Sequence, residues 1–297
     1  MAALFLVLTG LLMLIGYAIG YYFGEPLIFM GLGLVAAGVV NFVSYYWSDT
    51  IVVKMSRAKI IQETDNPTLY GAVRSVAQRA GIPMPRVGMV ESQQPNAFAT
   101  GRGPDKAVVV ATSGILNTLD PKELEAVIGH EVGHVVHRDV FMSSVAATIA
   151  GVISYVGTFA LWSTMLGGTR GSNRGGGNPI LLLAAVILVP MGATFVRLGI
   201  SRSFEYNADE YGAKLTHNPA GLASALQKIS VKVKTRPITN NQRSGSVTGP
   251  SPATASLWIV NPFRGSSLME IYSTHPSTEH RIERLRKIGE EIGVYVP

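Results

Sequence analysis

Three residues of the segment Ile128–His134 have the types and the spacing that metal-assisted hydrolysis needs. His130 and His134 stand four positions apart in an H-E-x-x-H pattern. On a helix both imidazoles therefore project from one face, where they can hold one Zn²⁺ ion. Glu131 lies about 100° further round the helix, beside the metal rather than on it. It can accept a proton from the attacking water, so the pattern predicts a hydrolytic zinc site.

The residues before this pattern predict the helix that carries it. Asp120 is a good N-cap, Pro121 suits the first helical position, and Glu123 closes a capping box. No proline interrupts the run through Val140. We therefore expect one helix that passes straight from the motif into a hydrophobic span. A helix with two surface histidines is the alternative.

A catalytic zinc site needs a third protein ligand and keeps one position for water. If the helices on both sides of the hydrophobic segment 140–196 are continuous, His134 and His130 stand about 9 and 15 Å outside the membrane and Glu205 about 13 Å. This match in height favours Glu205 as the third ligand. His137 lies seven residues after His130 and remains a competitor, as does His275.

Two further acids are candidates for supporting the site. Asp209, one turn after Glu205, would lie at the height of His130 and could accept its second ring N–H. Asp139 could pair with Arg202 or Arg197 at the membrane edge, and a plain surface acid is an equal alternative.

Composition indicates a membrane protein. The chain has 297 residues, of which 47% are hydrophobic and only 15% charged, and its mean hydropathy is +0.27. The absence of cysteine excludes disulfides and thiolate ligands. The net charge of +6 is scattered along the chain, which favours anionic lipid over nucleic acid as the partner. The uncharged spans argue against a transporter.

The hydropathy pattern divides the chain into four parts. Residues 1–48 form a transmembrane hairpin, for which a cleaved signal peptide is the alternative, and residues 49–139 form the first part of a catalytic domain. Residues 140–196 form a second hairpin, for which a buried or half-inserted hairpin is the alternative. Residues 197–297 complete the catalytic domain and include a loop at 236–253 whose composition predicts mobility.

Basic residues predict the orientation in the membrane. Lys54, Arg57 and Lys59 follow the second span closely, whereas the first turn carries only Glu25. By the positive-inside rule the catalytic domain faces the cytoplasm. Arg170 and Arg174, in the glycine-rich stretch between the third and fourth spans, weakly contradict this orientation.

Within the catalytic domain the periodicity predicts an α+β fold, mainly helical, with a small β-sheet. Strands are expected at 86–90, 96–100 and 107–111, and helices at 67–80, 219–232 and 277–288. We expect a substrate to bind in extended form along an exposed edge at 107–111, beside Val108 and Val110. Asn96 and Phe98 could line the same cleft, and a place in the core is the equal alternative for Phe98.

At this point the motifs resemble a known family, the HtpX-type membrane zinc endopeptidases. The resemblance rests on His130–His134, the segment Ser201–Asp209, the run Ser273–Pro276 with Arg281, and Asn96–Ala99, in the same order over nearly the whole chain. The relatives that process prenylated proteins share these motifs but are longer. The segment 236–253 matches no motif of the family.

The resemblance implies functional roles for these residues. His130, His134 and Glu205 would bind one zinc ion, and Glu131 would be the catalytic base. His275 and Arg281 would be donors to the developing oxyanion, for which a turn histidine before Pro276 and a solvated arginine on the last helix are the alternatives. It also implies an inner-membrane protease that takes part in quality control of membrane proteins, acting on protein or peptide substrates from the cytosolic side.

One rival belongs to a different class, a membrane scaffold with a structural zinc site. Structural zinc sites are usually closed by four protein ligands, so His137 or His275 as a fourth ligand would favour it. The sequence names neither the substrate nor the oligomeric state.

Overall fold

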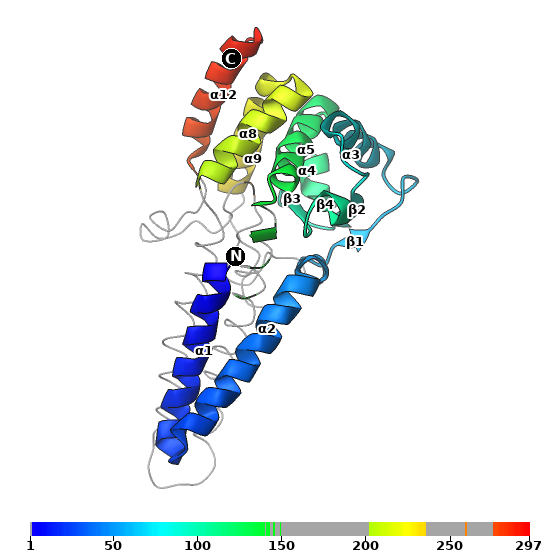
Figure 1. The fold of residues 1–297 in the computed structure, drawn as a ribbon. Helices are drawn as coiled ribbons and strands as arrows, with labels where there is room; N and C mark the ends of the chain where they lie inside the picture. The colour runs from blue at the N-terminus through cyan, green and yellow to red at the C-terminus, as the bar shows by residue number, and fades with distance from the viewer. Residues whose placement is uncertain are drawn as a thin grey trace. The chain divides into compact units, whose positions relative to one another are not determined.

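The computed structural model describes residues 2–139, 141–142, 145, 149, 202–235, 259 and 276–297 (Figure 1). It divides into two compact units, one made of Met1–Ser48 with Val145–Gly199 and the other of Asp49–Ser144 with Ile200–Pro297. Most of the predicted second hairpin, the predicted loop 236–253 and His275 lie outside the described residues. The proposed match in height between Glu205 and the histidines across that hairpin is therefore untested.

The first unit contains a hairpin of two apolar helices, α1 (Ala2–Phe23) and α2 (Pro26–Met55). Gly16 and Gly33 allow close packing, because a Cβ at either would collide with the backbone of the other helix. Among the described residues, α2 is the one helix long and apolar enough to cross a bilayer, and α1 contains a shorter apolar stretch, Phe5–Tyr17. Of the four predicted spans, the second is therefore a candidate span, the first contains the shorter apolar stretch, and the other two lie almost entirely outside the described residues.

The second unit contains a four-stranded mixed sheet in the order β1-β2-β4-β3. Its strands are β1 (Lys59–Ile60), β2 (Arg86–Val90), β3 (Ala97–Thr100) and β4 (Val108–Thr112). Strand β4 pairs in parallel with β2 and antiparallel with β3, so both of its edges are hydrogen-bonded to neighbouring strands. The prediction that residues 107–111 form an exposed edge is therefore wrong, and Val108 and Val110 are buried in the middle of the sheet.

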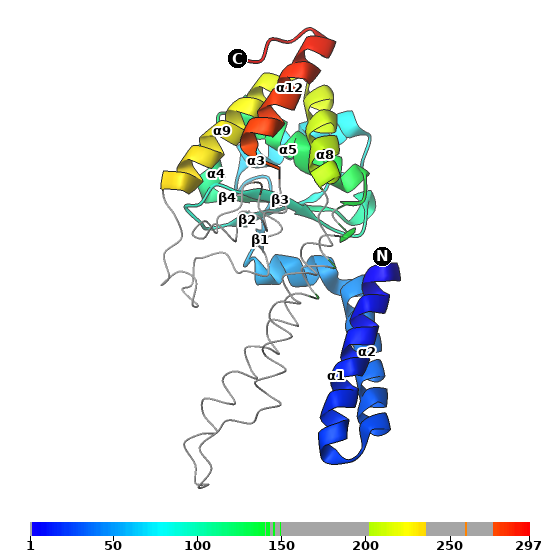
Figure 2. The same ribbon diagram turned by 90° about the vertical axis from the view of Figure 1, so that its left-hand side faces the viewer.

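Five longer helices accompany this sheet: α3 (Pro67–Ala80), α5 (Pro121–Val136), α8 (Arg202–Thr216), α9 (Pro219–Thr235) and α12 (Thr278–Ile292). In Figure 2, α5, α8, α9 and α12 lie on one side of the sheet. Apolar side chains from the helices and the sheet form one buried core, which includes Val73, Val109, Val127, Ile229 and Leu285. The predicted mainly helical α+β architecture is found in this unit.

The structure also contains elements that periodicity could not reveal. Strand β1, the 3-10 helix η1 (Pro104–Lys106) and the short helix α4 (Ser113–Leu116) have at most four residues each. A segment of that length is too short to show a repeating apolar pattern.

Helix α5 begins as predicted and ends earlier than predicted. The side chain of Asp120 accepts from the backbone of Glu123, and the Glu123 carboxylate accepts from the Asp120 N–H at 3.0 Å, which completes the capping box. The helix ends at Val136, and Arg138 adopts a left-handed conformation with φ 61°. The prediction of an unbroken helix through Val140 is therefore wrong, because one left-handed residue stops the hydrogen-bond ladder.

Candidate metal centre

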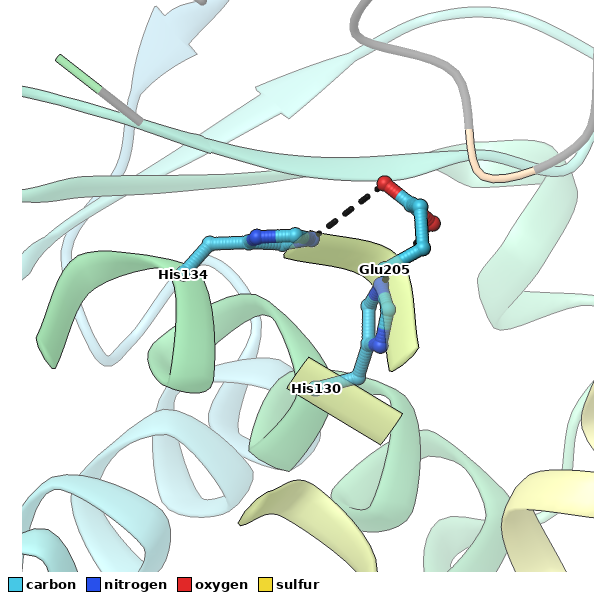
Figure 3. Close-up of side chains that lie close together, drawn as sticks. All are labelled: His130, His134 and Glu205. Carbon is cyan, nitrogen blue, oxygen red and sulfur yellow. Dashed lines mark ion pairs between the residues drawn. The ribbon is translucent and has the colours of Figure 1, made fainter. Parts of the chain in front are cut away.

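Three side chains with metal-binding atoms meet between α5 and α8. His130, His134 and Glu205 each contribute one ligand atom, and these three atoms lie within 4.8 Å of one another (Figure 3). His130 and Glu205 are buried, with 2% and 5% of their surface exposed. Glu205 lies in the first turn of α8 and points at both imidazoles. The structure thus brings the predicted pair and the predicted third ligand together.

The separations of these atoms fit a zinc ion. The Nε2 of His134 lies 3.5 Å from one carboxylate oxygen of Glu205, and the Nε2 of His130 lies 3.8 Å from the other. Ligands at about 2.1 Å from a tetrahedral Zn²⁺ would be about 3.4 Å apart. The donor set of two imidazoles and a carboxylate is one that catalytic zinc sites use.

Glycines allow α5 and α8 to come close enough for this. A Cβ on Gly212 of α8 would lie 2.5 Å from the backbone nitrogen of His130 and 2.7 Å from the carbonyl carbon of Gly129. Gly133, one turn further along α5, lies close to Ala208, since a Cβ there would be 3.2 Å from the Ala208 Cα. The backbone of α8 therefore packs directly on the histidine face of α5, and Glu205 is carried to the imidazoles.

Glu131 lies beside the ligands and is held by the sheet. Its carboxylate accepts a hydrogen bond of 2.9 Å from the backbone N–H of Ala99, on β3. Burial raises the pKa of Glu131 to about 7, although the neighbouring His134 opposes the shift. A carboxyl group with a pKa near neutrality suits a residue that must both take up and release a proton.

His130 is supported from behind by a buried ion pair. Its Nδ1 lies 2.9 Å from Oδ1 of Asp209, which leaves Nε2 directed at Glu205. Asp209 in turn accepts from Nε and Nη2 of Arg281 at 2.7 and 2.6 Å. Burial raises the pKa of Asp209, but the Arg281 guanidinium outweighs it and holds that pKa below its usual value. The predicted contact of Asp209 with His130 is present, and it fixes the ring orientation.

His134 has its own carboxylate neighbour. Its Nδ1 lies 3.6 Å from Oδ2 of Asp139, which is buried just after the left-handed turn at Arg138. Burial lowers the pKa of His134, but the carboxylates of Asp139 and Glu205 outweigh it and raise that pKa to about 10. The sequence leaves open whether Asp139 pairs with Arg202 or Arg197 or is a plain surface acid. In the structure it is buried and lies beside His134, because the chain turns at Arg138.

The other predicted residues lie as follows. His137 is exposed and stacks edge-on against the ring of Tyr211, with 5.3 Å between centroids, and it does not belong to the metal-binding group. Asn96 and Phe98 are both buried, at 1% and 5% exposure. Of the Arg281 donors, Nε and Nη2 are engaged by Asp209, and Nη1 points at the Ile259 carbonyl and at Glu205.

Three contacts at this site were not predicted. They are the hydrogen bond from Ala99 to Glu131, the ion pair between Arg281 and Asp209, and the contact of Asn96 with Ile259. Each joins residues that are far apart in the chain, and no local spacing signals them. The pairing of Gly129 and Gly133 on one helix with Gly212 on another was the available signal for the close helix approach.

Comparisons with known proteins place most of the chain in one family. The model of peptidase family M48 matches residues 63–289. A protease HtpX homolog of Pyrococcus furiosus is 47% identical over 97% of this chain and 94% of its own length. That of Aquifex aeolicus is 45% identical over 95% of this chain and 91% of its own length. The crystal structure of S. mikatae Ste24p aligns at 19% identity with a TM-score of 0.46, covering 93% of this chain and 62% of that one.

Proposed function

Because the chain belongs to peptidase family M48 and is a metallopeptidase, we propose that it is a zinc endopeptidase. Its catalytic centre is the cluster of His130, His134 and Glu205. One zinc ion per chain is held by His130, His134 and Glu205. The observation that carries the proposal is the convergence of three ligand atoms within 4.8 Å, with the buried carboxylate of Glu131 beside them. Asp209 and Asp139 position the two imidazoles.

The residues of the chain divide the steps of peptide hydrolysis among them. When bound, zinc supplies Lewis-acid chemistry that activates water and polarises a carbonyl group. Glu131 takes a proton from the attacking water and delivers it to the leaving amine. The hydrogen bond from Ala99 keeps its carboxylate aimed at the site. Arg281 is a proposed donor for charge on the substrate through Nη1, which here binds the Ile259 carbonyl and lies 3.3 Å from Glu205. His275 stays a predicted donor outside the described residues.

The substrate strand is proposed to pair with β3 rather than with β4. In an antiparallel pair, alternate residues direct their backbone groups away from the partner strand. Asn96 bonds to Thr112 of β4, so Ala97 and Ala99 face the opposite edge. The N–H of Ala99 does point there, at Glu131. Among the described strands none pairs with that edge, and its Ala99 N–H bonds to Glu131 beside the metal ligands.

Glu131→Gln tests the proposal. The amide keeps the size of the side chain but cannot take up a proton, so cleavage of casein by the full chain in detergent should fall by at least about a hundredfold. Zinc content, measured by atomic emission, should stay at one per chain. A scaffold with a structural zinc site would keep both properties, and it would need four protein ligands, whereas three gather among the described residues. Loss of zinc together with activity would contradict the assigned role of Glu131.

The setting in the membrane is part of the proposal. Helix α2 is a candidate span with Lys54 in its last turn, and Arg57 and Lys59 follow it closely. We infer several spans and a catalytic unit that faces the cytoplasm, by the positive-inside rule. Substrates are then proteins or peptides that reach the site at the membrane surface, in quality control of membrane proteins.

A further inference from the structure

Ile259 is held beside the metal centre by its backbone, and it is the one described residue between Thr235 and Pro276. Its N–H donates to the side-chain Oδ1 of Asn96 at 3.0 Å, across 163 positions of the chain. Its carbonyl accepts from Nη1 of Arg281 at 3.3 Å. Both polar groups of a single residue are therefore bound by side chains, outside any helix or strand ladder.

The two side chains that hold Ile259 belong to the surroundings of the site. Asn96 directly precedes β3 and is fixed there, because its own N–H and carbonyl both bond to Thr112. Arg281 Nη1 lies 3.3 Å from the ligand Glu205. Ile259 thus lies between the beginning of the proposed substrate strand partner and the metal ligands.

A fixed acceptor and a fixed donor on either side of one residue are what an extended substrate would need. A peptide chain offers one N–H and one carbonyl per residue, so Asn96 and Arg281 can hold any residue by its backbone and leave selection to the side chain. The side chain of Ile259 is 5% exposed and belongs to the apolar core. The space that receives it therefore suits an aliphatic side chain and disfavours a charged one.

From these contacts we propose that Ile259 is a pseudosubstrate residue, which occupies the position of an aliphatic substrate residue between Asn96 and Arg281. The inference rests on the peptidase function proposed above and adds to it the class of side chain accepted there. A substrate with an aliphatic residue competes with Ile259 for the same two hydrogen bonds. The site accordingly favours substrate segments with an aliphatic residue at this position.

Hydrogen exchange provides a test that needs no turnover. In Glu131→Gln protein, exchange at the Ile259 amide is measured with and without a short alanine-rich peptide that has a central isoleucine. The peptide should displace Ile259 and raise its exchange rate, whereas the same peptide with a central aspartate should not. An unchanged exchange rate at saturating isoleucine peptide would overturn the proposal, whether or not the protein proves to be a peptidase.

Kinetics of Ile259→Ala provide a second test. The weakened occupant should lower KM for the isoleucine peptide by roughly threefold to tenfold, because a larger fraction of the protein is free to bind substrate. Ile229→Ala is the matched control, since Ile229 is buried in the same core on α9. It should leave KM unchanged. Equal KM values for Ile259→Ala and Ile229→Ala would show that Ile259 only fills the core.

Discussion

At the scale of single residues, the centre depends on a chain of contacts that ends in a buried ion pair. Arg281 binds Asp209 through two hydrogen bonds, and Asp209 fixes His130. Both members of the pair are almost fully buried, at 1% and 0% exposure. A buried charge that loses its partner is strongly unfavourable, whereas removal of both charges is much less so.

Arg281→Met should therefore lower the free energy of unfolding by about 3–5 kcal/mol, because Asp209 is left charged and unpaired in the core. The double variant Asp209→Asn with Arg281→Met should recover a large part of this loss, and activity should stay low because His130 has lost its support. Thermal unfolding followed by circular dichroism measures the first effect and casein cleavage the second. Additive losses in the double variant would refute the coupling.

At the scale of elements, the approach of α5 and α8 decides whether a ligand set exists at all. His130 and His134 come from one helix and Glu205 from the other. The backbones meet at Gly129 and Gly212, where neither helix has room for a side-chain carbon. Helix packing at this contact therefore sets the distances within the metal centre.

Gly212→Ala should push the helices apart. Overpacking of this kind costs about 1–3 kcal/mol, and the retention of zinc against a chelator should fall, since Glu205 moves away from the imidazoles. Gly71→Ala is the matched control, because Gly71 lies inside α3 with nothing within 4 Å of its added Cβ. That change should stabilise the protein by about 0.5–1 kcal/mol and leave zinc retention unchanged. If both variants keep zinc equally well, packing at Gly212 does not set the site.

Strand β3 allows a second prediction at this scale, because neighbouring residues on it face different partners. Ala97→Pro removes an N–H from the edge that is proposed to bind substrate, so KM should rise by roughly fivefold to tenfold, the value of about one hydrogen bond. Phe98→Pro removes an N–H that faces β4 and should prevent folding instead. Zinc content and circular dichroism distinguish the two outcomes. An unchanged KM in folded Ala97→Pro protein would mean that substrate binds elsewhere.

At the scale of the whole molecule, the chain combines an apolar hairpin with a catalytic unit that has its own core. The helix α2 belongs to both, since the boundary falls between Ser48 and Asp49. Beyond that boundary Val52 is fully buried and Asp49 pairs with Arg86 at 3.2 Å. The end of the candidate span is therefore part of the folded catalytic unit.

The proposed membrane topology can be tested by labelling single introduced cysteines, because the chain has no cysteine of its own. Tyr295→Cys should react with a membrane-impermeant maleimide only in inside-out vesicles, since residue 295 is 85% exposed on the catalytic unit. Glu25→Cys, in the turn between α1 and α2, should react only in right-side-out vesicles. The basic residues after α2 are the physical reason. Labelling of both positions from the same side would contradict a hairpin that spans the membrane.

Local sequence determined those parts of the protein whose partners are near in the chain. Asp120, Pro121 and Glu123 specify the beginning of α5, and the spacing of His130 and His134 places both rings on one face, because a helix repeats every 3.6 residues. Strand β2 and helices α3, α9 and α12 were likewise predictable from periodicity and turn residues. The end of α5 was not predictable, because Arg138 adopts a left-handed conformation although arginine, unlike glycine, does not favour it.

Tertiary structure alone decided the contacts that join distant segments. The position of β4 inside the sheet, the pairing of Arg281 with Asp209 and the binding of Ile259 by Asn96 all depend on which faces pack together. Such contacts follow from the shape of the whole core, so residue types are compatible with several arrangements until packing selects one. The sequence therefore determined which side chains could perform the chemistry, and the close packing of α5 on α8 decided where they meet.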